Sequence, residues 1–321
     1  MPAPIEPGPF ALDDGPMKDA RTERWLIAGV DDSPHAAAVA HVALVLGRRL
    51  SLKVMLVHAV GGPAARTTLV GERRLDALDA GQSVLDAVTR RVGHDEELTV
   101  RLVFGGAAEQ ITELREQLDA ELIVTGSRGY GPLRAGLSGS VSHGLLMHAD
   151  VPVVIVPPEI DASWDVGSAI VCGVSEDSSS DDAIRLAGEM AVRLGARLTL
   201  LHARTLSPAG VPDVATPPGY YFDARAEVEE TTARQVLRDR RPLAGAQDVE
   251  LAFAVGGAAW NLRATADRER AGLLVVGSRR HGALRSFVSG SVSAHLAAHG
   301  PVPVMVVPSE GSSQHVAASY A

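Results

Sequence analysis

One long Gly- and Ser-rich phrase occurs twice in this chain. Residues 126–142 read GSRGYGPLRAGLSGSVS and residues 277–293 read GSRRHGALRSFVSGSVS, with 11 of 17 positions identical. Ordinary composition would give about one identity by chance. The segments 25–33 (WLIAGVDDS) and 151–157 (VPVVIVP) also recur, as AIVCGVSED 144 residues later and VPVMVVP 151 residues later. The chain is therefore two copies of one folding unit.

The length of 321 residues suits two domains of ordinary size. We expect a first domain over residues 23–158 and a second over 169–309, joined by a linker at 159–168. The Pro-rich, acidic residues 1–22 and the polar residues 310–321 are expected to be disordered tails.

Each copy alternates short Val-, Leu- and Ile-rich runs with segments of helical periodicity. The runs in the first copy are WLIAGV, LKVMLVHA, LTVRLVF, ELIVTG and VPVVIV, and segments such as ERRLDALDAGQSVLDAVTRRV lie between them. This alternation predicts parallel strands joined by helices on both faces. We therefore expect two tandem, open, five-stranded, parallel α/β domains that are Rossmann-like. The apolar last strands need covering, so the two copies are expected to pair through them.

Charge and composition argue against two classes of partner, nucleic acids and membranes. A net charge of −9 argues against a nucleic-acid partner, and no apolar run reaches the roughly 18 residues needed to span a membrane. The first residues do not resemble a signal peptide, so a cytoplasmic protein without membrane association is expected. The single cysteine, Cys172, lies in the run AIVCGV and is expected to be buried and inert.

The repeated phrase begins where a predicted strand ends, at the rim where open parallel sheets bind ligands. Its glycines allow close approach of the backbone, and Gly139-Ser140 opens a predicted helix whose first N–H groups can bind phosphate. A plain Gly-rich connection with a serine N-cap is the alternative. Neither a P-loop nor a dinucleotide G-x-G-x-x-G follows a strand in this sequence.

The spacing of Gly126, Gly129, Gly139 and Ser140 matches G-x2-G-x9-G-[ST], and on this pattern the chain resembles the universal stress protein family. The resemblance extends over about residues 24 to 309 and includes His58 and His202 at the ends of the second strands. It implies domains of the adenine nucleotide alpha hydrolase-like type that bind ATP, with or without Mg²⁺, and no metal site formed by protein side chains. The ATP-binding residues that it implies in the first copy are Val30, Asp31, Val57, Gly126, Arg128, Gly129, Gly139, Ser140, Val141 and Ser142.

The second copy departs from this pattern at two positions. Ser175 replaces Asp31, which removes the carboxylate expected at the adenosine end, and Arg280 replaces Gly129. Arginine adds a Cβ to a loop that should approach phosphate, although its guanidinium could also pair with phosphate oxygens. We therefore expect the main ATP site in the first copy. The weaker candidates in the second copy are Val174, Gly277, Arg279, Gly290, Ser291 and Ser293.

Other polar residues have a structural interpretation beside the functional one. The segment DDSP after the first strand also fits a helix cap at Asp32 or Ser33, with Pro34 as the first helical residue. His58 and His202 are expected to be structural histidines at the ends of buried strands, rather than catalytic residues.

Taken together, the residues and the resemblance favour an ATP-binding regulatory protein of the stress response, with at most weak ATPase activity. A weak ATP hydrolase and a nucleotide-free scaffold stay open as alternatives. The expected partners are an adenine nucleotide, a second copy of the chain in a homodimer, and a protein that the sequence does not identify.

Overall fold

The computed structural model describes residues 23–61, 72–93, 95, 98–127, 140–204, 230–278 and 291–309. Both predicted tails and the Gly/Ser-rich stretches 128–139 and 279–290 lie outside the described residues.

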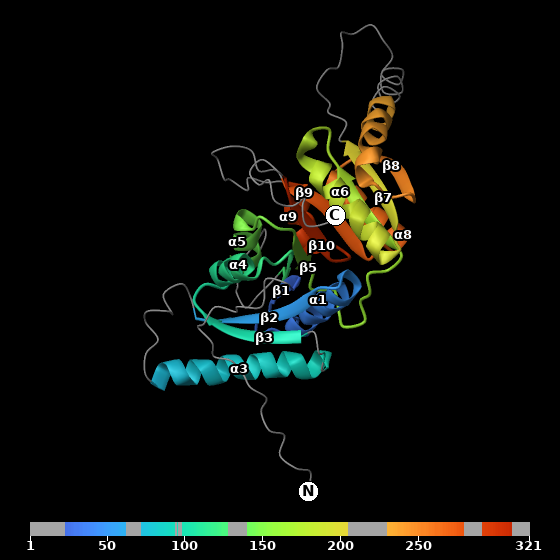
Figure 1. Cartoon of the computed structure of the whole chain (residues 1–321). Coiled ribbons are helices and arrows are strands. Elements are labelled where there is room, and N and C mark those ends of the chain that lie inside the picture. Colours follow the sequence, from blue (N-terminus) through green and yellow to red (C-terminus); the bar gives the residue numbers. More distant parts are fainter. Residues whose placement is uncertain are drawn as a thin grey trace.

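Ten strands of the described chain form one sheet in the order β3-β2-β1-β4-β5-β10-β9-β6-β7-β8 (Figure 1). The first five are β1 (Trp25–Gly29), β2 (Lys53–Val60), β3 (Leu98–Phe104), β4 (Leu122–Gly126) and β5 (Val153–Val156). The second five are β6 (Ala169–Val174), β7 (Arg197–Arg204), β8 (Val249–Val255), β9 (Leu273–Ser278) and β10 (Val304–Pro308). Neighbouring strands within each group of five are parallel, as expected. We call these two groups, with their helices, the first and the second domain.

Helices alternate with the strands along the chain. They are α1 (Ala36–Leu50), α3 (Glu72–Val92), α4 (Ala107–Leu118), α5 (Ser140–His148), α6 (Asp181–Leu194), α8 (Ala258–Glu269) and α9 (Ser291–His299), with short 3-10 helices η2 (Ser178–Ser180) and η3 (Arg241–Ala244). Residues 230–240 are also helical. The periodic segment at 72–92 was predicted to be a helix, and α3 confirms it.

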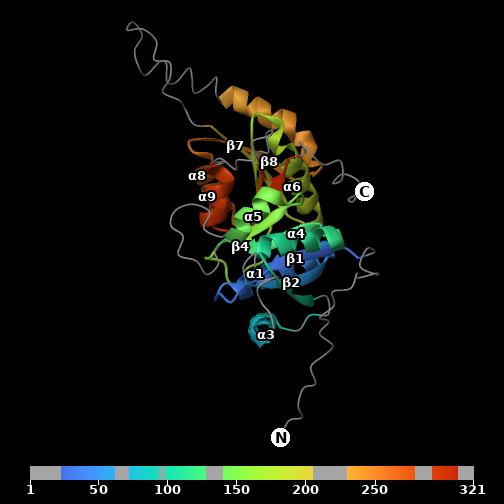
Figure 2. The same cartoon turned by 90° about the vertical axis from the view of Figure 1, so that its left-hand side faces the viewer.

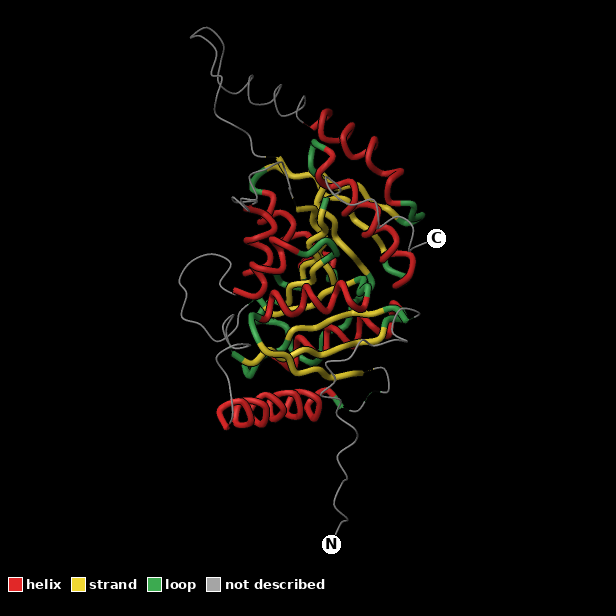
Figure 3. The backbone as a smooth tube through the Cα atoms, turned by 60° about the vertical axis from the view of Figure 1, so that its left-hand side comes forward, coloured by secondary structure: helices red, strands yellow, loops and turns green. Residues whose placement is uncertain are grey.

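The sheet lies between two layers of helices (Figure 3). Apolar side chains fill the space on each face of the sheet. In β1, Leu26 and Ala28 contribute to the core under α1, α3 and α6, while Trp25 and Ile27 contribute to the other. On that second face α4 packs beside α5, and α8 beside α9 (Figure 2). Burial of both faces explains why the strands are continuous apolar runs.

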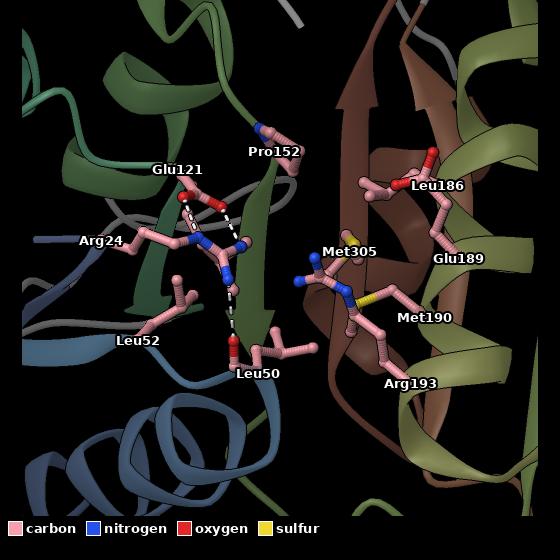
Figure 4. A pocket seen from close by; sticks show the side chains of 11 residues that line it. Arg24, Leu50, Leu52, Glu121, Pro152, Leu186, Glu189, Met190, Arg193 and Met305 are labelled. Carbon is pink, nitrogen blue, oxygen red and sulfur yellow. Dashed lines mark hydrogen bonds and ion pairs between the residues drawn. The ribbon is translucent and has the colours of Figure 1, made fainter. Parts of the chain in front are cut away.

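The two domains meet through their last strands. β5 and β10 pair antiparallel, with Val154 opposite Met305, which joins the two parallel halves into a continuous sheet. This confirms the predicted pairing of the last strands, because each apolar edge covers the other. Near the amino-terminal ends of the first-domain strands, Arg24 binds both carboxylate oxygens of Glu121, at 2.6 and 2.7 Å, beside this junction (Figure 4).

The segment predicted to be the linker packs against both domains. Nε2 of His41 in α1 lies 2.8 Å from the carbonyl oxygen of Trp164, whose indole N–H donates to Gly272 O at 3.2 Å. These contacts connect α1 of the first domain to the start of β9 in the second. No helix among the described residues is long and apolar enough to cross a membrane.

Candidate functional site

The strand order gives each domain one topological switch point, the position at which open parallel α/β sheets bind ligands. β1 lies between β2 and β4, and β6 lies between β7 and β9, so that successive connections leave β1 and β6 toward opposite sides. Such a switch point leaves a crevice at the carboxyl ends of the two central strands. The candidate site residues follow these strand ends in the sequence.

In the first domain, the structure brings Val30 and Val57 together at this position. Both are buried, and the N–H of Val30 donates to the carbonyl oxygen of Val57 at 2.9 Å. Nδ1 of His58 lies 2.9 Å from Val30 O. These bonds fix the backbone beyond the end of β1 against the end of β2.

Asp31 is the next residue, and its carboxylate is engaged locally. Its Oδ1 accepts the backbone N–H of Ser33 at 3.1 Å, which forms a tight turn directly after β1. The helix α1 begins at Ala36, its N-cap residue is His35, and no side chain caps it. The prediction of a cap at Asp32 or Ser33, with Pro34 as the first helical residue, is therefore wrong, because the turn after Asp31 delays the helix.

The Gly/Ser-rich stretch of the first domain lies in the sequence between the end of β4 and the start of α5. Gly126 is the last residue of β4, beside β1, and Ser140 is the first residue of α5. Within the first turn of α5, Val141 is half-buried and Ser142 is fully buried. Arg128, Gly129 and Gly139 lie outside the described residues, as does the side chain of Ser140.

The second domain contains a cavity of about 510 Å³ at the carboxyl ends of β6, β7 and β9. Of the second-copy candidates, the structure places Val174, Gly277 and Ser293 on its wall. Arg279, Arg280 and Gly290 lie outside the described residues, as does the side chain of Ser291. The residues of this wall that sequence reasoning did not select include Glu176, Asp177, Ser179, Ser180, His202 and Arg204.

A carboxylate is present in this cavity despite the loss at Ser175. Ser175 Oγ donates to Oδ1 of Asp177 at 2.8 Å, and the same oxygen accepts the N–H of Ser179 at 3.1 Å. Asp177 stands where the first copy has Ser33, so aspartate and serine have exchanged positions between the two turns, with SED at 175–177 against DDS at 31–33. The donor differs as well, since it is the backbone N–H of Ser33 in the first domain and the hydroxyl of Ser175 in the second. The second copy therefore lacks a carboxylate at the position of Asp31, as expected, and has one two residues further along the chain.

Gly277 has a packing role at the end of β9. A Cβ built on it would lie 2.2 Å from the carbonyl oxygen of Ser179, so that only glycine lets η2 approach this strand. The glycine at this position is explained without any ligand, although it also forms part of the cavity wall.

Charged groups line one side of the same cavity. Glu176 Oε1 pairs with Nη1 of Arg204 at 2.9 Å, and the carbonyl oxygen of Glu176 accepts from Nη2 of Arg240 at 3.1 Å. His202, at the end of β7, is buried, with its Nδ1 2.8 Å from Val174 O. The first copy has Val60 at the position of Arg204, so this ion pair is specific to the second domain.

Cys172 lies behind this cavity in β6. Its side chain is fully buried, and burial raises the pKa of the thiol to about 12. The expectation that Cys172 is buried is confirmed, and its low reactivity stays a prediction.

Comparison with known proteins agrees with the duplicated fold. The model of the universal stress protein family matches residues 24–157 and again 168–308. A universal stress protein of Mycolicibacterium smegmatis is 29% identical over 305 residues, which cover 91% of this chain and 99% of the relative. One of Mycobacterium tuberculosis is 30% identical over 90% of this chain and 98% of its own length.

A solved structure of a universal stress protein from Archaeoglobus fulgidus has the same fold. It covers 88% of this chain and 98% of its own, with a TM-score of 0.60 and 18% identity. The duplicated sequence, the paired five-stranded halves and both family matches lead to one conclusion. The chain belongs to the universal stress protein family and contains two copies of the family's domain in tandem.

Proposed function

We propose that this chain is an ATP-binding regulatory protein of the stress response, with its main nucleotide site in the first domain. The observation that supports it is the meeting of three groups at the first switch point. These are the buried residues Val30 and Val57, the carboxylate of Asp31 after β1, and the end of β4 at Gly126, which begins the Gly126-x2-Gly129-x9-Gly139-Ser140 pattern of the sequence.

Each group has a part in the proposed site. The apolar side chains of Val30 and Val57 suit the adenine ring, and the Asp31 carboxylate suits the ribose hydroxyls as hydrogen-bond donors. The first turn of α5 carries the positive end of the helix dipole, which favours phosphate. ATP would be held in this way, with or without Mg²⁺.

Regulation would follow from linkage between binding and stability. A ligand at a hundred times its dissociation constant stabilises the folded state by about 2.7 kcal/mol. Such a gain can shift the equilibrium between conformations that present different surfaces to a protein partner or to a second copy of the chain. We propose that the protein acts in the cytoplasm.

The carboxylate of Asp31 provides the test. Asp31→Asn keeps an oxygen that can accept the N–H of Ser33, but removes the charge. We expect ATP affinity, measured by isothermal titration calorimetry, to fall about tenfold or more, because a charged hydrogen bond becomes a neutral one.

The neighbouring Asp32→Asn is the matched control, because Asp32 is exposed and lies one residue further along the same turn. It should leave the affinity unchanged within about twofold, as expected for a surface change away from a site. Equal affinities for wild type and Asp31→Asn would contradict the assignment of Asp31.

A further inference from the structure

The His202 imidazole has a defined tautomer. Its Nδ1 lies 2.8 Å from the carbonyl oxygen of Val174, and a carbonyl oxygen can only accept a hydrogen bond. The neutral ring therefore carries its hydrogen on Nδ1, and Nε2 is left as an acceptor. The side chain is 3% exposed.

Nε2 of His202 is buried and has no hydrogen-bond partner among the described residues. Glu176 Oε1 lies 3.9 Å away, beyond hydrogen-bond distance, and an ionised carboxylate has no hydrogen to donate to a neutral ring. Arg204 holds this oxygen at 2.9 Å, and Arg240 holds the backbone of Glu176 at 3.1 Å. Glu176 is therefore held by other partners and donates no hydrogen bond to Nε2 of His202.

A buried acceptor without a donor is uncommon in a folded protein and marks a position that a ligand can complete. His202 lines the cavity of about 510 Å³, a volume within the range of small-molecule sites. Val174, Leu201 and Leu262 form apolar parts of the wall, while Asp177 adds a polar group. This combination suits a ligand with a flat apolar body and hydroxyl or amine groups at its edge.

We propose that His202 is a specificity-determining residue of the second-domain cavity, where its Nε2 accepts a hydrogen bond from a hydroxyl or amine of a bound nucleoside group. This inference rests on the proposed function, which supplies the ligand class. The second site is the weaker of two, and its preference comes from a hydrogen bond to the nucleoside rather than from the phosphates.

Two substitutions separate the acceptor from the structural bond. His202→Asn retains a side-chain N–H near the position of Nδ1, which can donate to Val174 O, but removes the group at Nε2. His202→Gln places an amide oxygen near the position of Nε2 and so restores the acceptor. His58→Asn makes the same change in the first domain, where Nδ1 lies 2.9 Å from Val30 O.

The experiment is equilibrium dialysis of the full chain against labelled ATP at pH 7.5. We expect two classes of site in the wild type, and a weaker class that loses about tenfold in affinity in His202→Asn, as for one lost hydrogen bond. His202→Gln should bind within about threefold of wild type, because its amide oxygen replaces Nε2 as the acceptor. His58→Asn should leave the weaker class unchanged.

Three results would overturn the inference. A weaker class that is unaffected by His202→Asn would show that Nε2 does not contact the ligand, while the tight class would leave the proposed function standing. A wild type that binds ATP only in the tight class would also overturn this inference and leave the proposed function standing. Absence of any ATP binding by the wild type would overturn the proposed function and this inference with it.

Discussion

At the scale of the residue, the two copies place aspartate and serine in opposite order after the first strand of each domain. In the first domain Oδ1 of Asp31 accepts the backbone N–H of Ser33, whereas in the second Oδ1 of Asp177 accepts the hydroxyl of Ser175. Comparing single positions could not predict this, because the hydrogen bond depends on a pair of residues and on the path of the turn. Val30 and Val57 were expected at the site only from the resemblance to the family; in the structure Val30 follows β1, and Val57 lies within β2.

Glu189 is an exposed residue of α6 that borders the small junction space opposite Arg24 and Glu121 (Figure 4). Partial burial of its carboxyl raises the pKa above its ordinary value, although Arg193 partly offsets this. A carboxyl whose pKa is raised in the folded state stabilises the folded protein at pH values below its unfolded pKa, near 4.5. This stabilisation is lost as the pH rises through the pKa of the folded state. Glu189→Gln should therefore raise the melting temperature at pH 7, and the gain should vanish near pH 4.

Glu121→Gln is the control from the same junction. Its carboxylate binds Arg24 through two hydrogen bonds, so this substitution should lower the melting temperature at pH 7. Thermal unfolding followed by circular dichroism at both pH values measures the two variants. A lower melting temperature for Glu189→Gln at pH 7 would contradict the account.

At the scale of the element, the periodic pattern predicted the strands and helices well, because each strand is buried on both faces and each helix on one. Contacts that depend on a particular neighbour were not predictable. The delay of α1 to Ala36 and the packing of Trp164 against Gly272 are two examples. Most of the candidate ATP residues lie in the repeated phrase at 126–142, and residues 128–139 of this phrase lie outside the described residues. The assignment of the phrase to an ATP site therefore stays a prediction.

The end of β9 provides a prediction at this scale. Gly277→Ala would place a Cβ 2.2 Å from the carbonyl oxygen of Ser179 and force η2 away from the strand. We expect a loss of about 1–3 kcal/mol in the free energy of unfolding, as for other overpacked sites.

Gly257→Ala is the matched control, because a Cβ there meets no atom within 4 Å and its φ of −64° suits alanine. It should cost about 1 kcal/mol or less, the usual effect of alanine at a helix N-cap. Urea denaturation followed by circular dichroism compares the two, and equal losses would argue against a special role for Gly277.

At the scale of the whole molecule, the antiparallel pairing of β5 with β10 turns two open domains into a single ten-stranded sheet among the described residues. The sequence predicted this pairing, since two apolar last strands each needed a partner. Each domain retains its own switch point, with one at β1 and β4 and the other at β6 and β9. The duplication therefore retains the same switch-point geometry in both domains, while the residues that follow the strands have diverged.

The most direct measurement is to denature the purified protein and to identify and count the nucleotide that it releases. The account predicts about one ATP per chain, retained by the first domain, since the second site depends on a weaker contact and should empty during purification. Release of two tightly held nucleotides would contradict the difference between the domains. Release of none, together with no thermal shift on addition of ATP and Mg²⁺, would contradict nucleotide binding itself.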